Sequence, residues 1–301
     1  MRFSIITPSF RSSEWLKLCV ASVADQQGAS FEHIVQDSCS DDGTQMWLPG
    51  DSRVKAFVEK DSGMYDAVNR GLRRATGEIM AYLNCDEQYL PGALAAVMEM
   101  FERRPEVDIV LADTVVTDSD GGFVCCRKSL VPWRLMAWTF LPTITSSIFF
   151  HRRVVDDFNQ FFDVRWRAIG DVTWMQEALR LRLKMAVLRR YTSAFADTGD
   201  NMSLKPNAAR EKQRWARMRP LWARWFGWAL LQGHRLRAAG QGVYWERPFC
   251  YSVYTRQMPC GRTDVQVSKP TGIWWQRHKV AAEQRKLRAE RVVENRSKRQ
   301  L

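Results

Sequence analysis

Short apolar runs alternate with helix-periodic segments along the first two-thirds of the chain, which is typical of βαβ units around a parallel sheet. The runs that predict strands are Phe3–Thr7, Phe31–Gln36, Val54–Val58, Glu78–Leu83 and Asp108–Leu111. Helical spacing of apolar residues predicts helices over Glu14–Ala24, over Met64–Arg74 and from Pro91, a residue favoured in a first helical turn. Thr114–Cys126, with Asp120-Gly121-Gly122 at its centre, predicts a hairpin whose turn needs positive φ. The pattern therefore predicts an α/β fold.

Polar and acidic residues follow the first four predicted strands. They are Thr7, Pro8 and Ser9 after the first, Asp37 after the second, Asp61, Asp66 and Asn69 after the third, and Asn84 and Asp86 after the fourth. Open α/β sheets bind ligands at the carboxyl ends of their strands, so we expect these residues at one rim. Like charges gathered there repel each other unless a cation lies among them. Oxygen ligands suit Mg²⁺ or Mn²⁺, and Asp86 is the best candidate for the metal-binding carboxylate.

Each of these residues also has a purely structural interpretation. Asp37 belongs to ordinary turn chemistry, and Asp86 could favour the N-terminus of the following helix. Asp171 could cap the helix that carries Trp174 and Met175. Capping does not explain why such residues occur at four consecutive strand ends, and this joint occurrence favours a shared site.

The order of these motifs resembles that of the inverting, family-two glycosyltransferases of the GT-A fold, which move a sugar from a nucleotide-sugar donor. The segments that carry the resemblance are Thr7-Pro8-Ser9-Phe10, Asp37–Thr44, Gly63–Gly71, Asn84-Cys85-Asp86-Glu87, Pro142–Arg153, Phe162-Asp163 with Arg167–Met175, and Thr198–Ser203. The resemblance covers residues 3–203 and implies a mixed, mostly parallel sheet flanked by helices.

The resemblance also implies roles for individual residues. Asp37 matches the acidic residue that contacts the uracil ring, and Asp86 matches the metal-binding carboxylate of the D-x-D motif, in which Asn84 replaces the first Asp. Asp171 matches the catalytic base. The remaining donor-side positions are Thr7, Pro8, Ser9, Asp61, Asp66 and Asn69. A metal at Asp86 would neutralise the leaving diphosphate, and a base at Asp171 would accept the acceptor hydroxyl's proton. A single displacement of this kind inverts the anomeric carbon.

Charge divides the chain into two parts. Residues 204–301 contain 22 Lys and Arg against 6 Asp and Glu, a net charge of +16, whereas the first 203 residues have a net charge of −4. Seven of the thirteen Trp lie in the same last third. We therefore predict a catalytic domain over 1–203 and a basic, Trp-rich helical extension over 204–301.

The extension indicates a second partner. Residues 208–231 predict a helix that Pro220 kinks or restarts, and its arginines beside a Trp stripe suit an anionic membrane surface. The alternative is that these Trp pack on the catalytic domain and the arginines are solvated. Nucleic acid is not favoured, because the front part is net negative and has no nucleic-acid motif. Arg277–Arg299 predicts a charged helix or a frayed tail.

Composition excludes several classes of protein. Hydrophobic residues make up 46% and charged residues 26%, which excludes wholesale disorder. Seven cysteines without a C-x-x-C pair argue against a disulfide scaffold. The longest charge-free stretch, Leu135–Phe150, is shorter than the ~20 apolar residues of a membrane span, and Phe3–Ile6 is too short for a secretory signal. We expect a cytoplasmic enzyme that can bind the cytoplasmic face of the membrane.

The resemblance implies a metal-dependent glycosyltransferase that uses a UDP-sugar and extends a polysaccharide or a lipid-linked glycan. Two alternatives stay open. A nucleotidyltransferase would be expected to have a Gly-rich, basic loop after its first strand, which Thr7-Pro8-Ser9-Phe10 lacks. A non-catalytic membrane-bound scaffold would be consistent with Asn84 in the metal motif. The sugar, the acceptor and the oligomeric state do not follow from the sequence.

Overall fold

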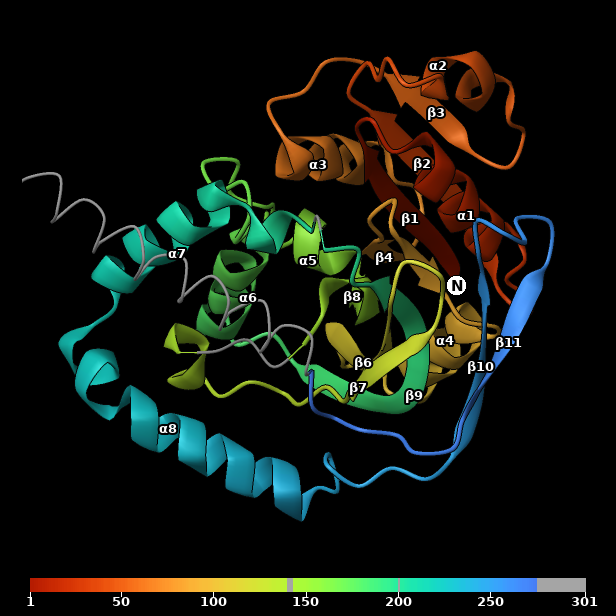
Figure 1. The fold of residues 1–301 in the computed structure, drawn as a ribbon. Helices are drawn as coiled ribbons and strands as arrows, with labels where there is room; N and C mark the ends of the chain where they lie inside the picture. The colour runs from red at the N-terminus through yellow and green to blue at the C-terminus, as the bar shows by residue number, and fades with distance from the viewer. Residues whose placement is uncertain (140–142, 200, 275–301) are drawn as a thin grey trace, which may run out of the picture.

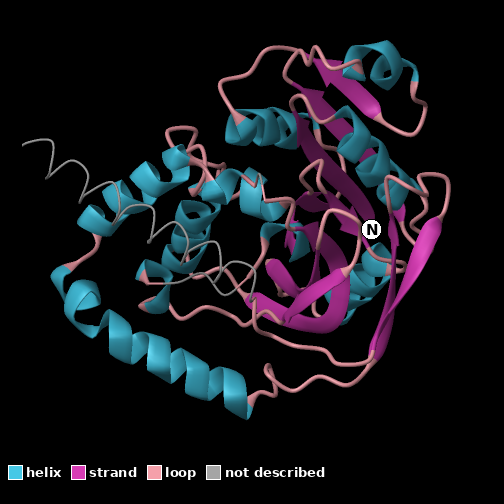
Figure 2. Ribbon diagram, in the orientation of Figure 1, coloured by secondary structure: helices cyan, strands magenta, loops and turns pink. Residues whose placement is uncertain are grey.

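The computed structural model describes residues 1–139, 143–199 and 201–274, and a curled mixed sheet lies at its centre (Figures 1 and 2). Its strands are β1 (Arg2–Ser9), β2 (Ser30–Asp37), β3 (Lys55–Val58), β4 (Ile79–Tyr82), β5 (Glu87–Tyr89), β6 (Ile109–Thr117), β7 (Phe123–Arg127), β8 (Ile148–His151) and β9 (Met185–Ala196). Across the described residues the order is β3-β2-β1-β4-β8-β6-β9-β5, with β7 paired to β6 off this path. The expected α/β architecture is confirmed.

Helices cover both faces of the sheet. They are α1 (Ser13–Ala24), α2 (Thr44–Trp47), α3 (Met64–Arg74), α4 (Ala93–Arg103), α5 (Arg153–Asp156), α6 (Gly170–Arg180), α7 (Pro206–Met218) and α8 (Leu221–Gly240). The predicted β6–β7 hairpin is confirmed, with Gly121 at φ 85°. The prediction for Pro91 was wrong in detail, because α4 begins at Ala93 behind Gly92 at φ 70°, and Pro91 precedes that cap.

The first four strands run in the same direction, which places their carboxyl ends at one edge. β1 pairs in parallel with β2 on one side and with β4 on the other, and β2 pairs in parallel with β3. The register sets Ser9 beside Asp37, and Asp37 beside Val58. The polar segments that follow these strands therefore emerge at the same rim, as the sequence predicts.

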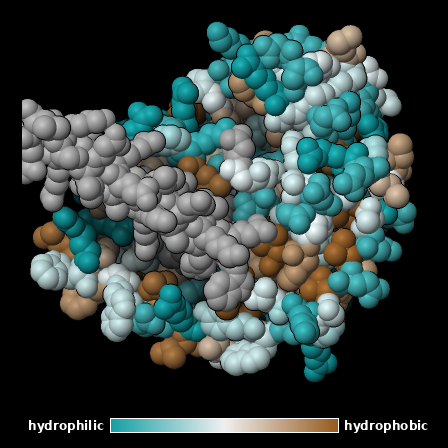
Figure 3. Space-filling model, viewed as in Figure 1, coloured by the Kyte–Doolittle hydropathy of each residue, from teal (hydrophilic) through white to brown (hydrophobic). Residues whose placement is uncertain are grey.

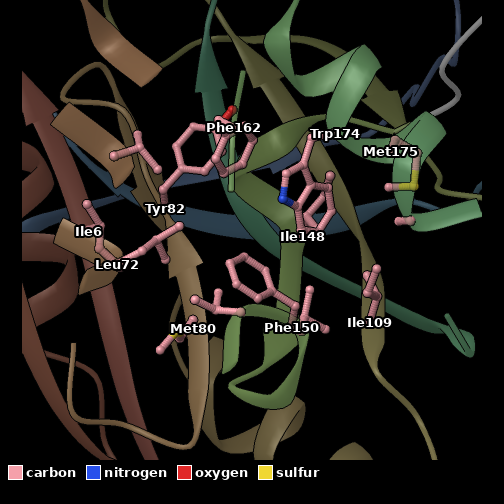
Figure 4. Packing of buried hydrophobic residues seen from close by; sticks show 14 of the residues in the cluster. Ile6, Leu72, Met80, Tyr82, Ile109, Ile148, Phe150, Phe162, Trp174 and Met175 are labelled. Carbon is pink, nitrogen blue, oxygen red and sulfur yellow. The ribbon is translucent and has the colours of Figure 1, made fainter. Parts of the chain in front are cut away.

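Two buried clusters hold the helices against the sheet. On one face Ile6 and Tyr82 of the strands pack with Leu72 of α3, with Phe162 and with Trp174 of α6 (Figure 4). The opposite cluster joins strand residues to α1 and α4; its members include Phe3, Ile5, Cys19, Val23, Leu94, Val97 and Phe101. Apolar burial on both faces explains why the strands read as continuous apolar runs.

The last third contains both the predicted helices and two strands that the sequence interpretation missed. Pro220 ends one helix and begins the next, so the predicted restart is confirmed. The strands β10 (Phe249–Tyr254) and β11 (Arg262–Val267) form an antiparallel hairpin. The alternating apolar residues Phe249, Tyr251 and Val253 were the available signal for β10.

This hairpin packs against the front of the chain. Tyr251, Val253 and Val267 share a buried cluster with Leu90, Val115 and Ala194. The side-chain amide of Gln88 donates to the Tyr254 carbonyl and accepts from its N–H, both at 2.8 Å. Arg262 donates to both carboxylate oxygens of Asp25 at 2.6 and 2.7 Å. The boundary predicted between 203 and 204 thus separates segments that share a core.

Among the described helices, none has the length and apolar character that crossing a bilayer requires. Pro142 and the predicted helix or tail over Arg277–Arg299 lie outside the described residues.

Candidate active site

The loops that follow β1 and β2 are tied together at the rim. Asp37 is fully buried, and its two carboxylate oxygens accept hydrogen bonds from the Ser40 hydroxyl at 2.6 Å and the Ser40 N–H at 2.8 Å. The Ser40 hydroxyl in turn accepts from the N–H of Arg11, which stands at φ 51°. The exposed guanidinium of Arg11 forms a bidentate pair with Asp41. Asp37 therefore stabilises this turn. A contact between Asp37 and a donor base stays a prediction.

The other positions predicted to bind the donor differ in how available they are. Thr7 is buried and its hydroxyl is 2.8 Å from Nε2 of His33, whereas the buried hydroxyl of Ser9 has no partner within the described residues. Pro8 lies buried between them. Asp61 sits near Asp37, because its N–H donates to Ser38 Oγ at 3.3 Å, and burial raises the pKa of Asp61.

Two predicted donor residues on α3 have structural partners. Asp66 accepts from the Ser62 N–H and pairs with Arg70, which stabilises the first turn of α3. Asn69 is buried, and its amide donates to the Phe162 carbonyl at 2.8 Å and accepts from the Phe162 N–H at 2.9 Å. Both ends of this amide are engaged, so Asn69 holds the backbone at Phe162 against α3. Any effect of Asn69 on donor binding would therefore be indirect.

Asp86 lies in the turn between β4 and β5 and is partly exposed. One of its oxygens accepts from the Asn201 amide at 3.4 Å. The neighbouring Glu87 is fully buried, with one oxygen bound to the Asn84 N–H at 2.8 Å and the other without a partner in the described structure. Burial raises the pKa of both Asp86 and Glu87, and the charge of Asp86 raises that of Glu87 further.

The chemistry of this turn fits a divalent cation that is shared with a ligand. The side-chain oxygen of Asn84 is buried and unpartnered among the described residues, and it is two residues from the carboxylate of Asp86. Mg²⁺ and Mn²⁺ bind through one or two carboxylates and complete their shell with water or phosphate. No group of three or more His, Cys, Asp or Glu in the described part of the chain could hold a metal unaided. The protein oxygens present suit a cation that phosphate ligands complete.

Asp171 lies in the first turn of α6 beneath the ring of Tyr65. The Tyr65 hydroxyl donates to a carboxylate oxygen of Asp171 at 3.3 Å and accepts from the Asp171 N–H at 3.1 Å. Burial raises the pKa of Asp171, and hydrogen bonds from the Val172 N–H and from Tyr65 oppose this rise. Gly170 makes the approach possible, since a Cβ there would lie 2.6 Å from the Tyr65 ring.

A small cavity opens beside Asp171. Its walls are mostly aromatic and aliphatic, and its lining residues are Tyr82, Thr145, Ile148, Phe150, Phe162, Asp171 and Trp174. Figure 4 shows Tyr82, Phe162 and Trp174 gathered on one side of the sheet. A carboxylate held in such a wall is poorly hydrated, which strengthens it as a base.

The structure brings the metal motif and the predicted base into one region. The negative charge of Asp171 contributes to the raised pKa of Glu87, and it also raises the pKa of Tyr82. The Asp37 loops lie at the same sheet edge, where β1 separates β2 from β4. No hydrogen bond within the described residues joins Asp37 to Asp86 or Asp171, so a ligand would have to connect them.

Sequence reasoning missed two contributors to this site. Tyr65 lies between the Asp61 and Asp66 that were selected, and Gly170 beside Asp171 was the available signal of a close approach. Asn201 belongs to the predicted closing segment Thr198–Ser203, whose residue 200 lies outside the described residues. A second cavity reaches from Asp86 to Trp15 of α1 and Tyr254 of β10. The hairpin of the last third therefore borders the metal motif.

The chain is similar to known glycosyltransferases. The model of the family described as Glycosyl transferase family 2 matches residues 4–165, more than half of the chain. The putative teichuronic acid biosynthesis glycosyltransferase TuaG of Bacillus subtilis is 34% identical over 106 residues, which are 34% of this chain and 42% of TuaG. The GalNAc(5)-diNAcBac-PP-undecaprenol beta-1,3-glucosyltransferase of Campylobacter jejuni is 31% identical over 104 residues, 33% of this chain and 34% of that enzyme. The chain thus spans less than half the length of these two relatives.

Solved structures show the same fold. Residues 1–349 of Staphylococcus aureus TarS, in complex with UDP-GlcNAc, superpose with a TM-score of 0.55 at 19% identity, over 68% of this chain and 61% of that one. The mannosyltransferase PcManGT of Pyrobaculum calidifontis, in complex with GDP-Man and Mn²⁺, gives a TM-score of 0.50 at 16% identity. The match covers 70% of this chain and 60% of that one. These likenesses show the fold, and the family match does not favour a nucleotidyltransferase.

Proposed function

This chain belongs to glycosyl transferase family 2, and we propose that it transfers a sugar from a UDP-sugar to an acceptor hydroxyl with inversion of the anomeric carbon. The observation that carries the proposal is the pairing of an oxygen-rich turn at Asp86 with the half-buried, Tyr65-bound Asp171 in one region of the sheet edge. The UDP-GlcNAc complex of the similarly folded TarS supports the choice of donor class.

Asp86, with the side-chain oxygen of Asn84, would hold Mg²⁺ or Mn²⁺. When bound, the ion supplies positive charge that stabilises the leaving diphosphate. The Mn²⁺ complex of PcManGT, a protein of the same fold, supports this assignment. Asn201 already contacts Asp86 and would orient its carboxylate.

Asp171 would act as the general base. Its raised pKa and poorly hydrated position make it a better proton acceptor than an exposed carboxylate. The acceptor oxygen forms a bond to the anomeric carbon as its proton passes to Asp171, and the bond between that carbon and the diphosphate oxygen breaks. Attack opposite to the leaving group inverts the configuration. The hydrogen bond from the Tyr65 hydroxyl holds the Asp171 carboxylate in position.

For the acceptor we propose a glycan or a lipid-linked glycan, reached at the cytoplasmic face of the membrane. The Campylobacter relative is named for an undecaprenol-linked substrate, and TuaG is named for the biosynthesis of a polysaccharide.

The first test is release of nucleoside diphosphate from a panel of UDP- and GDP-sugars with and without Mn²⁺. We expect UDP release that needs the metal, and the Asp86→Ala variant should lose it while keeping its thermal stability. Because Asn84 flanks the same turn, Asn84→Ala serves as a graded comparison with partial loss. Release of pyrophosphate would indicate a nucleotidyltransferase, absence of turnover with every donor would support a scaffold, and full activity of Asp86→Ala would refute the metal assignment.

A further inference from the structure

The helix α8 carries a stripe of exposed apolar side chains. Leu221, Trp225, Trp228 and Leu236 are 69%, 81%, 74% and 74% exposed. At about 100° per residue these positions fall within about 80° of the helix circumference. They form one continuous strip, here termed the α8 stripe, along a helix of 20 residues. Large apolar side chains exposed together mark an interaction surface more often than chance exposure does.

The opposite side of α8 is the one that packs on the protein. Ala223, His234 and Ala238 are buried, and a Cβ on Gly227 would lie 3.3 Å from Thr139. Figure 1 shows α8 at the periphery, away from β1 to β4, and Figure 3 shows apolar surface among polar patches where the helix runs. The α8 stripe is therefore not the core side of the helix.

The neighbourhood of the stripe is purely basic. Residues 212–245 contain seven Lys and Arg and no Asp or Glu. Arg224 and Arg235 flank the stripe and are exposed, and neither forms an ion pair within the described residues. An apolar strip bordered by unpaired guanidiniums complements a surface that is apolar inside and anionic at its edge.

We propose that α8 docks in the plane of an anionic lipid bilayer, with the α8 stripe among the acyl chains and Arg224 and Arg235 at the lipid phosphates. The proposal rests on the proposed function only in that a lipid-linked acceptor requires the enzyme at a membrane. It refines the region predicted from the sequence. In α7, Trp215 is buried and stacks on Trp138, so α7 is not part of the insertion surface.

The test is co-sedimentation of the full chain with vesicles that hold no acceptor, made of phosphatidylcholine alone or with about 30% phosphatidylglycerol. We expect binding to the anionic vesicles, weakened at least tenfold in the Trp225→Ser/Trp228→Ser double variant. Replacing Arg224 and Arg235 with Gln should weaken it by about fivefold per residue, on anionic vesicles only. Phe226→Ser is the matched control, because Phe226 is 63% exposed on the same helix but off the stripe. Its binding should change less than twofold.

Asp171→Asn separates this proposal from the proposed function, because it should remove transfer and leave vesicle binding intact. UDP release without vesicle binding would overturn the membrane surface alone, and vesicle binding without UDP release would overturn the enzymatic function alone. An equal loss of vesicle binding in Phe226→Ser and in the double variant would show that the α8 stripe does not set how α8 lies on the membrane, and would overturn the proposal. A dimer in light scattering that the double variant abolishes would assign the stripe to a second copy of the chain and overturn the proposal.

Discussion

Asp37 and Asp171 are two carboxylates at the same edge of the sheet that are stabilised in different ways. Both carboxylate oxygens of Asp37 are satisfied by Ser40, three residues away. Asp171 receives its side-chain hydrogen bond from Tyr65, which is 106 residues away, and its other surroundings are mostly apolar. A carboxylate with full local hydrogen bonding stabilises a loop, whereas one held by a distant hydroxyl and a neighbouring N–H in a mostly apolar wall keeps its capacity to accept a proton.

The largest effect that follows from this contrast is expected for Asp171→Asn. The amide cannot take up the acceptor's proton, so the rate of transfer should fall by about 10²–10⁴. The affinity for UDP should stay within about twofold, since the substitution is nearly isosteric. Single-turnover transfer and UDP titration measure the two quantities. Retention of transfer would place the base elsewhere.

Tyr65→Phe should produce an intermediate effect and a shift with pH. The Tyr65 hydroxyl lowers the pKa of Asp171, so its removal leaves burial less opposed and the pKa rises. A general base acts when deprotonated, and its activity is lost as the pH falls through its pKa. The acid limb of kcat/KM against pH should therefore move to higher pH, with about a tenfold loss at neutral pH.

A merely structural role of Tyr65 would lower stability and leave the pH profile in place. Tyr89→Phe is a suitable control, because Tyr89 is also fully buried and its hydroxyl has no partner among the described residues. Its acid limb should not move.

Asp37→Asn should have the smallest effect of the three. The amide oxygen still accepts from Ser40, so the free energy of unfolding should fall by only about 1 kcal/mol. If Asp37 also contacts the donor base, the KM for the UDP-sugar should rise while kcat changes little. Steady-state kinetics against Asp41→Asn, whose exposed pair with Arg11 contributes little, measures this difference. An unchanged KM would limit Asp37 to its turn.

The rim that carries Asp37 could be predicted from the sequence more fully than the contacts between distant segments. Apolar periodicity predicted β1 to β4 and the bounds of α3, and parallel pairing then required the rim that carries Asp37 and Asp86. The assignment of Asn69 to the donor did not anticipate its amide's engagement with Phe162, because the partner lies 93 residues away in sequence. A residue whose role depends on one contact distant in sequence does not show in the apolar periodicity of the chain.

The sequence by itself determined the first four strands with the helices α1 and α3, the Asp37 turn, the break at Pro220 and the basic character of the last third. These features depend on interactions between residues a few positions apart, such as side-chain periodicity, turn hydrogen bonds and the missing N–H of proline. Only the tertiary structure decided that Tyr65 holds Asp171, that Asn201 reaches Asp86, that β10 and β11 pack beside the metal motif, and that Trp215 is buried while Trp225 is exposed. Those outcomes depend on which distant surfaces meet when the core closes, and a local pattern does not encode that choice.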